Sequence, residues 1–323
     1  MNRLTSYSNG IHCISLPTPF AVGDVNVHIV ESEKLTLIDA GVKTEEAWQV
    51  FKNELQHIGY SYTDIEQVVI THHHPDHVGM LDFLSTDIPI FGHRFNRPWI
   101  TNDEVFFKHH DQFYLDLFVN LGLDEALLEK AAHLKDPLAF NCHRELTHEL
   151  QEGDKIPGLP GWEVLETPGH AQSHIALYHK ENSLLLGGDL LIGHISSNPL
   201  FEPPMKGNER PKTLLQYNSS LRKISDLDLD VIYTGHGSII NHATELIKER
   251  LHKQEKRAEL VLELLKKNGP QTCLQLCQSL FPQVYKREVA LTLSETLGQL
   301  DYLEEDNYIQ VDRTKVPWLF YSI

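Results

Sequence analysis

The stretch THHHPDHVG, residues 71–79, gathers four histidines and one aspartate directly after a short apolar run. The run has the length and composition of a buried strand. His72 and His74 alternate, so both side chains can point to one side where this strand ends. Asp76 and His77 would then face back from the start of the next helix. This arrangement can bring imidazoles and a carboxylate into a small volume, as a zinc or iron site requires.

Three further segments each place a histidine or an aspartate just past a strand-like run and next to glycine. These segments are Thr167–His170, Gly187–Asp189 and Thr234–Gly237. Ligands delivered from strand ends by short, tight loops are what a rigid site needs. Because these segments supply matching ligands, a site is a better interpretation than a surface cluster of histidines.

With these four segments the chain resembles the metallo-β-lactamase superfamily, whose mark is HxHxDH followed by a later His, Asp and His. The likeness covers roughly residues 10 to 240. It implies an α/β fold, a four-layer αβ/βα sandwich with the site at one edge between two sheets. It also implies two divalent metal ions, most often zinc, with iron or manganese in relatives. Imidazole and carboxylate ligands fit any of these metals.

The resemblance also implies a role for each ligand position. One metal would be held by His72, His74 and His170, the second by Asp76, His77 and His236, and Asp189 would bridge them. Two ions about 3.5–4 Å apart can lower the pKa of a shared water, so that a metal-bound hydroxide attacks a carbonyl carbon or a phosphorus. Asp76 would orient this nucleophile and could accept its proton.

Three other histidines lie close to these positions in the sequence. His73 stands between two ligands and is expected to point away from them. His174 is expected to belong to a strand or to support a ligand. His194 follows Asp189 by five positions and is a candidate substrate contact or acid.

Length and composition set broad limits on the function. The chain has 323 residues, 41% of them hydrophobic, which is ample for a buried core. Its amino terminus carries no apolar stretch of signal-peptide length, and no segment has the roughly 20 apolar residues of a membrane span. A cytoplasmic protein with no membrane partner is therefore expected. The net charge of −17 disfavours binding through nucleic-acid phosphates.

A segment from about residue 97 to 135 interrupts the strands with apolar residues at helical spacing. Two interpretations remain open: the helices pack on the sheet, or they form a lid over an apolar substrate chamber. In the second, Phe107, Phe113 and Tyr114 are candidate substrate contacts. Such side chains suit an acyl chain or a lactone tail better than a phosphodiester, although aromatic rings also stack on bases.

The pattern changes again near residue 250, where three predicted helices are followed by a predicted hairpin. This order is typical of a winged-helix module, so the sequence predicts a catalytic domain over 1–250 and a winged-helix-like domain over 251–323. The second range holds nine basic and ten acidic residues. Because no basic stripe is present, capping of the core or formation of a homodimer is favoured over DNA binding.

A core of this type with such a tail is similar to the group that includes β-lactamase-like protein 2. Relatives of that group cleave thioesters of carrier-bound acyl chains, or single-stranded RNA. The sequence therefore predicts a dinuclear metal-dependent hydrolase of an ester, thioester or lactone, with a small molecule or an acyl-thioester as substrate. The alternatives are a metal-dependent phosphodiesterase or endoribonuclease, and a diiron redox protein or non-catalytic regulator.

Overall fold

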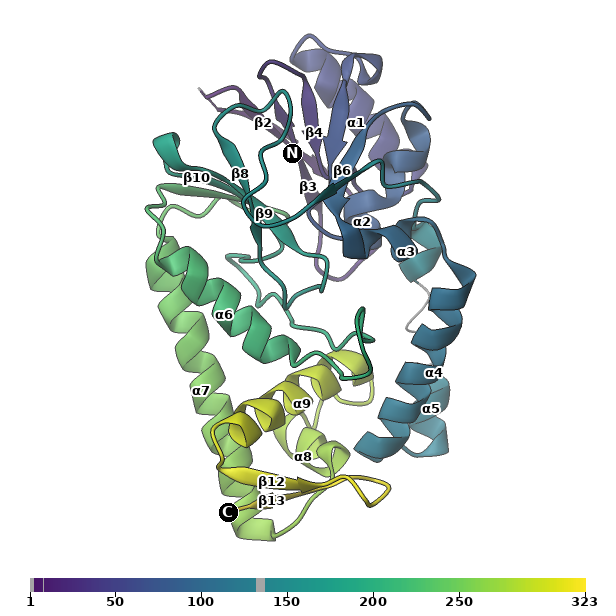
Figure 1. The fold of residues 1–323 in the computed structure, drawn as a ribbon, viewed down its shortest axis with the longest axis vertical. Coiled ribbons are helices and arrows are strands. Elements are labelled where there is room, and N and C mark those ends of the chain that lie inside the picture. Colours follow the sequence, from purple (N-terminus) through teal and green to yellow (C-terminus); the bar gives the residue numbers. More distant parts are fainter. Residues whose placement is uncertain (1–2, 8, 132–136) are drawn as a thin grey trace.

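The computed structural model of the chain describes residues 3–7, 9–131 and 137–323. Two β-sheets lie face to face with helices on both outer sides (Figure 1). This is the expected four-layer αβ/βα sandwich. The last part of the predicted insertion, residues 132–135, falls outside the described ranges.

The first sheet has seven strands that neighbour one another in sequence order. They are β1 (Leu4–Ser6), β2 (Ile11–Leu16), β3 (Val25–Val30), β4 (Thr36–Ile38), β5 (Gln67–Val69), β6 (Ile90–His93) and β7 (His148–Leu150). The pairs from β1 to β4 are antiparallel, and those from β4 to β7 are parallel. In the parallel half, β4 and β5 end at the same edge, so Asp39 and residues 71–77 leave the sheet side by side.

The second sheet has four strands in the order β11-β10-β9-β8. They are β8 (Trp162–Glu166), β9 (Ile175–His179), β10 (Leu184–Gly188) and β11 (Val231–Thr234). Strands β10 and β11 are parallel, and the other two pairs are antiparallel. A core between the sheets joins Ile38 and Val69 of the first to Val164, Leu177 and Leu186 of the second. This apolar packing fixes the distance between the sheet edges that carry the predicted ligands.

Each sheet is covered by helices on its outer face. Helix α1 (Glu45–His57) packs Phe51 and Leu55 against the first sheet. Helix α6 (Thr213–Ser225) packs Tyr217 and Leu221 against the second. The side chain of Thr44 caps α1 by accepting a hydrogen bond from the backbone N–H of Ala47.

The helix that is expected to start at Asp76 and His77 is short. Helix α2 (Pro75–Val78) gives way to a 3₁₀ turn, η2 (Gly79–Phe83). A Cβ atom at Gly79 would overlap the backbone nitrogen of Lys43, so the chain passes too close to its neighbour here for any other residue. Other short 3₁₀ turns are η1 (Tyr62–Asp64), η3 (Arg94–Asn96) and η5 (Lys180–Asn182).

The predicted insertion forms helices α3 (Arg97–Ile100), α4 (Glu104–Leu121) and α5 (Glu125–Ala131). Figure 1 shows α4 running away from the sheets toward the C-terminal part of the chain. Its buried residues Phe118 and Leu121 belong to a core shared with that part. Much of the apolar face of α4 is therefore used against the C-terminal helices rather than against a sheet.

The C-terminal module consists of α7 (Ala243–Asn268), α8 (Cys273–Leu280), α9 (Val289–Glu305), β12 (Ile309–Asp312) and β13 (Leu319–Ser322). Three helices followed by an antiparallel pair is the predicted order. Helix α7 runs without a break through residue 250, where the domain boundary is predicted: its residue Ile247 packs with the second sheet, and Val261 packs in the module. No helix in the described ranges is long and apolar enough to cross a bilayer.

Candidate metal centre

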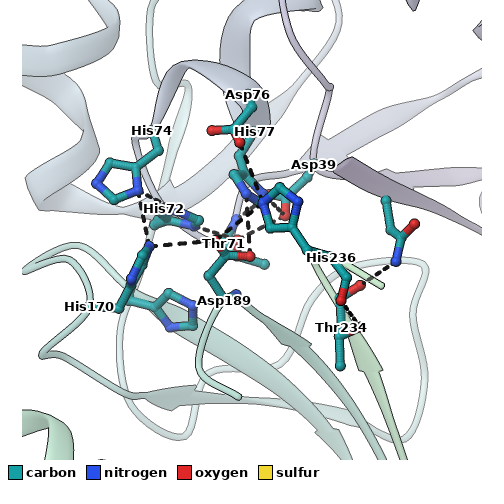
Figure 2. Close-up of polar contacts among 12 residues, drawn as sticks. Asp39, Thr71, His72, His74, Asp76, His77, His170, Asp189, Thr234 and His236 are labelled. Atoms are coloured by element: carbon teal, nitrogen blue, oxygen red, sulfur yellow. Dashed lines mark hydrogen bonds and ion pairs between the residues drawn. The ribbon is translucent and has the colours of Figure 1, made fainter. Parts of the chain in front are cut away.

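The seven predicted ligands converge at one edge of the sandwich (Figure 2). His72, His74, Asp76 and His77 come from the turn after β5 and from α2, and the others follow β8, β10 and β11. Glycines allow the close approach of these loops. A Cβ atom at Gly235 would overlap Oδ1 of Asp189, and Gly169 has a φ of 136° and lies against Tyr217.

Three histidines form the first group of donors. Nδ1 of His74 lies 3.0 Å from Nε2 of His72 and 3.0 Å from Nε2 of His170. Three imidazole nitrogens at this spacing could coordinate one ion from a single side.

Asp76, His77 and His236 form the second group of donors. Nε2 of His236 lies 3.4 Å from Oδ2 of Asp76. Asp189 lies between the groups: its Oδ2 is 3.4 Å from Nε2 of His236 and 3.6 Å from Nε2 of His170, and its Oδ1 is 3.4 Å from Nε2 of His77. One carboxylate therefore reaches donors of both groups, as a bridging ligand would.

The residues present fit a pair of divalent ions. Nε2 of His77 and Oδ1 of Asp189 are buried and make no hydrogen bond with the described residues, and the contact nearest to one is the 3.4 Å between the two atoms themselves. Buried polar atoms without a hydrogen bond are costly. Both atoms point into the space between the two groups (Figure 2). Coordination of a cation would satisfy both, and histidine with carboxylate is a donor set that suits zinc, iron or manganese.

The electrostatics differ between the two groups. Burial lowers the pKa of His74 to about 4 and that of His170 to about 3, so both rings are neutral near pH 7. Neutral imidazole is the form that binds a metal. Burial also disfavours the charged forms in the second group, but there the carboxylate of Asp189 raises the pKa of His236 to about 10. In turn, His236 and His77 hold the pKa of Asp189 well below its ordinary value despite burial.

Supporting contacts fix the second nitrogen of several rings, as is usual around protein-bound metals. Nδ1 of His77 lies 2.9 Å from Oδ2 of Asp39, and Nδ1 of His236 lies 2.8 Å from the carbonyl oxygen of Asp24. Nδ1 of His170 lies 3.1 Å from the carbonyl oxygen of Asn198. Sequence reasoning missed Asp39, and its only signal was its position directly after a buried strand.

His174 supports Asp189, as one of its two expected roles requires. Its Nε2 accepts a hydrogen bond from the backbone N–H of Asp189 at 3.1 Å, and its Nδ1 lies 2.8 Å from Oγ1 of Thr167. His73 belongs to neither donor group: its Nδ1 lies 2.8 Å from Oγ of Ser173, and its ring stacks on Trp99 with centroids 4.0 Å apart.

The predicted substrate contacts lie in different places. Phe107 contacts Trp99, with ring centroids 5.7 Å apart, and so lies near His73. The hydroxyl of Tyr114 donates to the carbonyl oxygen of Phe201 at 2.7 Å. Phe113 lines a cavity of about 680 Å³ between α4 and the C-terminal module, away from the donor groups. His194 is exposed beside Gly237 and lines a cavity of about 640 Å³ next to the loop of His236.

Known proteins share both the sequence pattern and the fold. The family model described as the metallo-beta-lactamase superfamily matches residues 21–236. The probable metallo-hydrolase YqjP of Bacillus subtilis is 46% identical, and the match covers 92% of each chain. A beta-lactamase-like protein 2 homolog of Caenorhabditis elegans is 25% identical over 82% of this chain and 73% of its own.

A solved structure extends the likeness to the C-terminal module. A metallo-beta-lactamase family protein from Thermus thermophilus superposes with a TM-score of 0.80 at 26% identity. The superposition covers 97% of this chain and 99% of that one. A hydroxyacylglutathione hydrolase of Bartonella tribocorum is 26% identical over 68% of this chain and 82% of its own. The fold, the order of the donor residues and these matches agree, and the chain belongs to the metallo-beta-lactamase superfamily.

Proposed function

We propose that this metallo-hydrolase is dinuclear and hydrolyses the acyl C–O bond of an ester or a lactone, or the acyl C–S bond of a thioester. The observation that carries the proposal is the position of Asp189, whose carboxylate oxygens lie within 3.6 Å of donors from both groups. When bound there, two divalent ions would activate water and polarise a carbonyl oxygen. Zinc is the ion we favour, because histidine-rich sites with carboxylates suit it well.

Asp76 is the residue we assign to proton handling. The residue is 7% exposed, and its carboxylate belongs to the second donor group. Burial would raise its pKa, but His77 and His236 hold that pKa below its ordinary value, so the group is ionised at neutral pH. An ionised carboxylate at this position can orient a water molecule and accept its proton.

Aromatic side chains near the first donor group support a substrate with an apolar part. The ring of His73, between two predicted ligands, stacks on Trp99. Trp99 in turn contacts Phe106 at 4.9 Å and Phe107 at 5.7 Å. Trp99 itself is buried, and the half-buried Phe106 and Phe107 are the rings of this group that could meet an acyl chain. The net charge of −17 and the resemblance to a hydroxyacylglutathione hydrolase point the same way, toward a small molecule or an acyl-thioester rather than a nucleic acid.

The test is hydrolysis of a panel of acyl-thioesters and lactones by the metal-loaded protein. Wild type should turn over at least one member, and Asp76→Ala should keep its fold and lose roughly 10²–10⁴-fold in rate, measured at a zinc concentration that fills both sites of the variant. Asp87→Ala, at an exposed aspartate, is the matched control and should behave as wild type. Full activity in metal-loaded Asp76→Ala would refute the role of Asp76. No turnover at full metal occupancy would refute the carbonyl substrate, and phosphodiesters and RNA would then be tested.

A further inference from the structure

The first donor group is held from outside the two sheets by a short segment between β10 and α6, residues 198–202. The carbonyl oxygen of Asn198 lies 3.1 Å from Nδ1 of His170. A histidine that binds a metal through one nitrogen usually has its other nitrogen fixed by a carbonyl or a carboxylate. Asn198 therefore sets the orientation of the His170 ring.

Glu202, at the other end of this segment, contacts both loops that carry the first group. Both of its carboxylate oxygens accept a hydrogen bond from the backbone N–H of Gln172, with N···O distances of 3.3 and 3.2 Å. Gln172 lies two residues after His170 in the same loop. Oε1 of Glu202 lies 3.9 Å from Nε2 of His73, between the ligands His72 and His74.

Glu202 is in a costly position for a carboxylate. It is 3% exposed, and the hydrogen bonds that its carboxyl group accepts come from a single backbone N–H, that of Gln172. A buried carboxyl group with so few partners destabilises a fold, whether it is ionised or protonated, whereas an apolar side chain of similar size would not. Stability of the fold therefore does not explain a glutamate at this position, whereas its contacts with the two ligand loops do.

The same segment is fixed on its other side by α4 and by the C-terminal module. The backbone N–H of Phe201 donates to Oγ of Ser294 in α9 at 3.3 Å, and its carbonyl oxygen accepts from the hydroxyl of Tyr114 in α4 at 2.7 Å. The Phe201 ring is buried in the core that joins α4 to the module. Residues 198–202 thus connect that core to the first donor group.

The second donor group is supported differently. His77 is held by Asp39, which follows β4, and His236 is held by the carbonyl oxygen of Asp24, which precedes β3. Both supports come from the first sheet, far along the chain from the module. The two halves of the centre therefore depend on different parts of the protein.

We infer that Glu202 is a positioning residue for the metal held by His72, His74 and His170, and that the C-terminal module with α4 acts through residues 198–202 on this metal alone. The inference rests on the dinuclear centre proposed above. It gives the C-terminal module a role in metal binding that needs neither DNA nor a second copy of the chain.

The experiment measures the two zinc affinities of the full-length, initially metal-free protein by stepwise competition with a chromophoric chelator, and counts bound zinc by plasma emission. His170→Ala and His236→Ala serve as references that show which step belongs to which half. Glu202→Ala should weaken the step that His170→Ala removes by about 10- to 100-fold and leave the other step within about twofold. Glu202→Gln should recover most of this loss, because its amide oxygen can still accept from the N–H of Gln172.

Two further arms separate this role from a general loss of structure. Glu209→Ala, at an exposed glutamate in the same stretch of chain, should leave both steps unchanged. Ser294→Ala combined with Tyr114→Phe removes both hydrogen bonds to Phe201 and should weaken the same step as Glu202→Ala, by a smaller factor. Equal weakening of both steps in Glu202→Ala, or no change in either, would overturn the inference and leave the proposed function intact. Binding of a single zinc ion by wild type would overturn both.

Discussion

Oδ2 of Asp39 lies 2.9 Å from Nδ1 of His77, and the same carboxylate accepts hydrogen bonds from the backbone N–H and the hydroxyl of Thr71. Asp39 is 2% exposed and has a φ of 59°, a left-handed conformation that aspartate and asparagine tolerate better than most residues. One side chain after β4 therefore fixes both the start of the histidine stretch and the ring of a predicted ligand.

Replacement of Asp39 should affect the second half of the centre. Asp39→Ala should weaken the zinc step assigned to His77 and His236 by about 10- to 100-fold, because the His77 ring loses its acceptor. It should also cost about 1–3 kcal/mol in the free energy of unfolding, because the N–H of Thr71 is left buried without a partner. Chelator competition and urea unfolding of the metal-free protein measure these two effects.

Asp39→Asn separates the two effects. Asparagine keeps the left-handed conformation, and its amide oxygen can still accept from Thr71, so stability should be largely retained. The negative charge beside His77 is lost, so zinc binding should still weaken. If Asp39→Asn bound both ions as tightly as wild type, the carboxylate would have no part in orienting His77.

The stability of the metal-free protein should depend on pH through Glu202. Burial raises the pKa of this carboxyl to about 8 in the folded chain, from an ordinary value of 4.5. A carboxyl whose pKa is raised by folding contributes stability that is complete below pH 4.5 and is lost as the pH rises toward 8. The free energy of unfolding of wild type should thus fall relative to Glu202→Gln between about pH 5 and 8, by on the order of 1 kcal/mol per pH unit.

Urea unfolding at four pH values in the presence of a chelator gives this difference curve. Glu209→Gln, at an exposed site on the same stretch, should run parallel to wild type. A flat difference between wild type and Glu202→Gln would show that Glu202 keeps an ordinary pKa in the folded chain. Greater stability of metal-free Glu202→Gln at pH 8 would fit a carboxylate that serves metal binding at the expense of the fold.

Phe118 should be one of the side chains that attach the insertion to the C-terminal module. It is 3% exposed and lies 5.8 Å from the ring of Phe201, whereas its neighbour Val119 is 38% exposed. Phe118→Ala should therefore lower the free energy of unfolding by about 3–5 kcal/mol. Val119→Ala, the control on the same helix, should change it by less than about 1 kcal/mol. Similar small effects for both would mean that α4 does not depend on the module.

The shared core also bears on truncation near residue 251. Loss of residues 251–323 would expose Phe118 and Leu121 of α4 and would remove the last 18 of the 26 residues of α7. The shortened chain should be poorly soluble and should bind a dye specific for exposed apolar surface. A soluble, monomeric and equally stable core would contradict a structural role for the module.

Sequence patterns predict much of this structure because strands and ligands are local features. Six-residue β2 and β3 have clear apolar content, and the HxHxDH spacing specifies where the donors stand. The edge strands β1 and β7 have three residues each and largely exposed side chains, so neither has a periodicity to detect. Asp39 and Glu202 were missed for a related reason: each acts through a contact that only the folded chain creates.

The insertion shows where a pattern leaves two outcomes open. Helical spacing correctly predicts helices there, but it does not say which partner their apolar faces meet. Phe118 meets the module, whereas Phe106 and Phe107 at the start of α4 meet Trp99 beside the donor groups. The two ends of one helix thus have different surroundings, and a single role for all of its aromatic residues is an oversimplification.

This difference gives a test of where the substrate binds. Phe107 contacts Trp99, which stacks on His73, whereas Phe113 lines the cavity between α4 and the C-terminal module. If an acyl chain lies along Phe106 and Phe107, Phe107→Ala should raise KM for long acyl-thioesters by about 10-fold and leave KM for short ones nearly unchanged. The reason is that burial of each methylene contributes about 0.8 kcal/mol. Phe113→Ala should leave the dependence on chain length unchanged. Steady-state kinetics over a series of chain lengths decides between the two positions, since an effect of Phe113→Ala alone would place the acyl chain in the cavity beside the module.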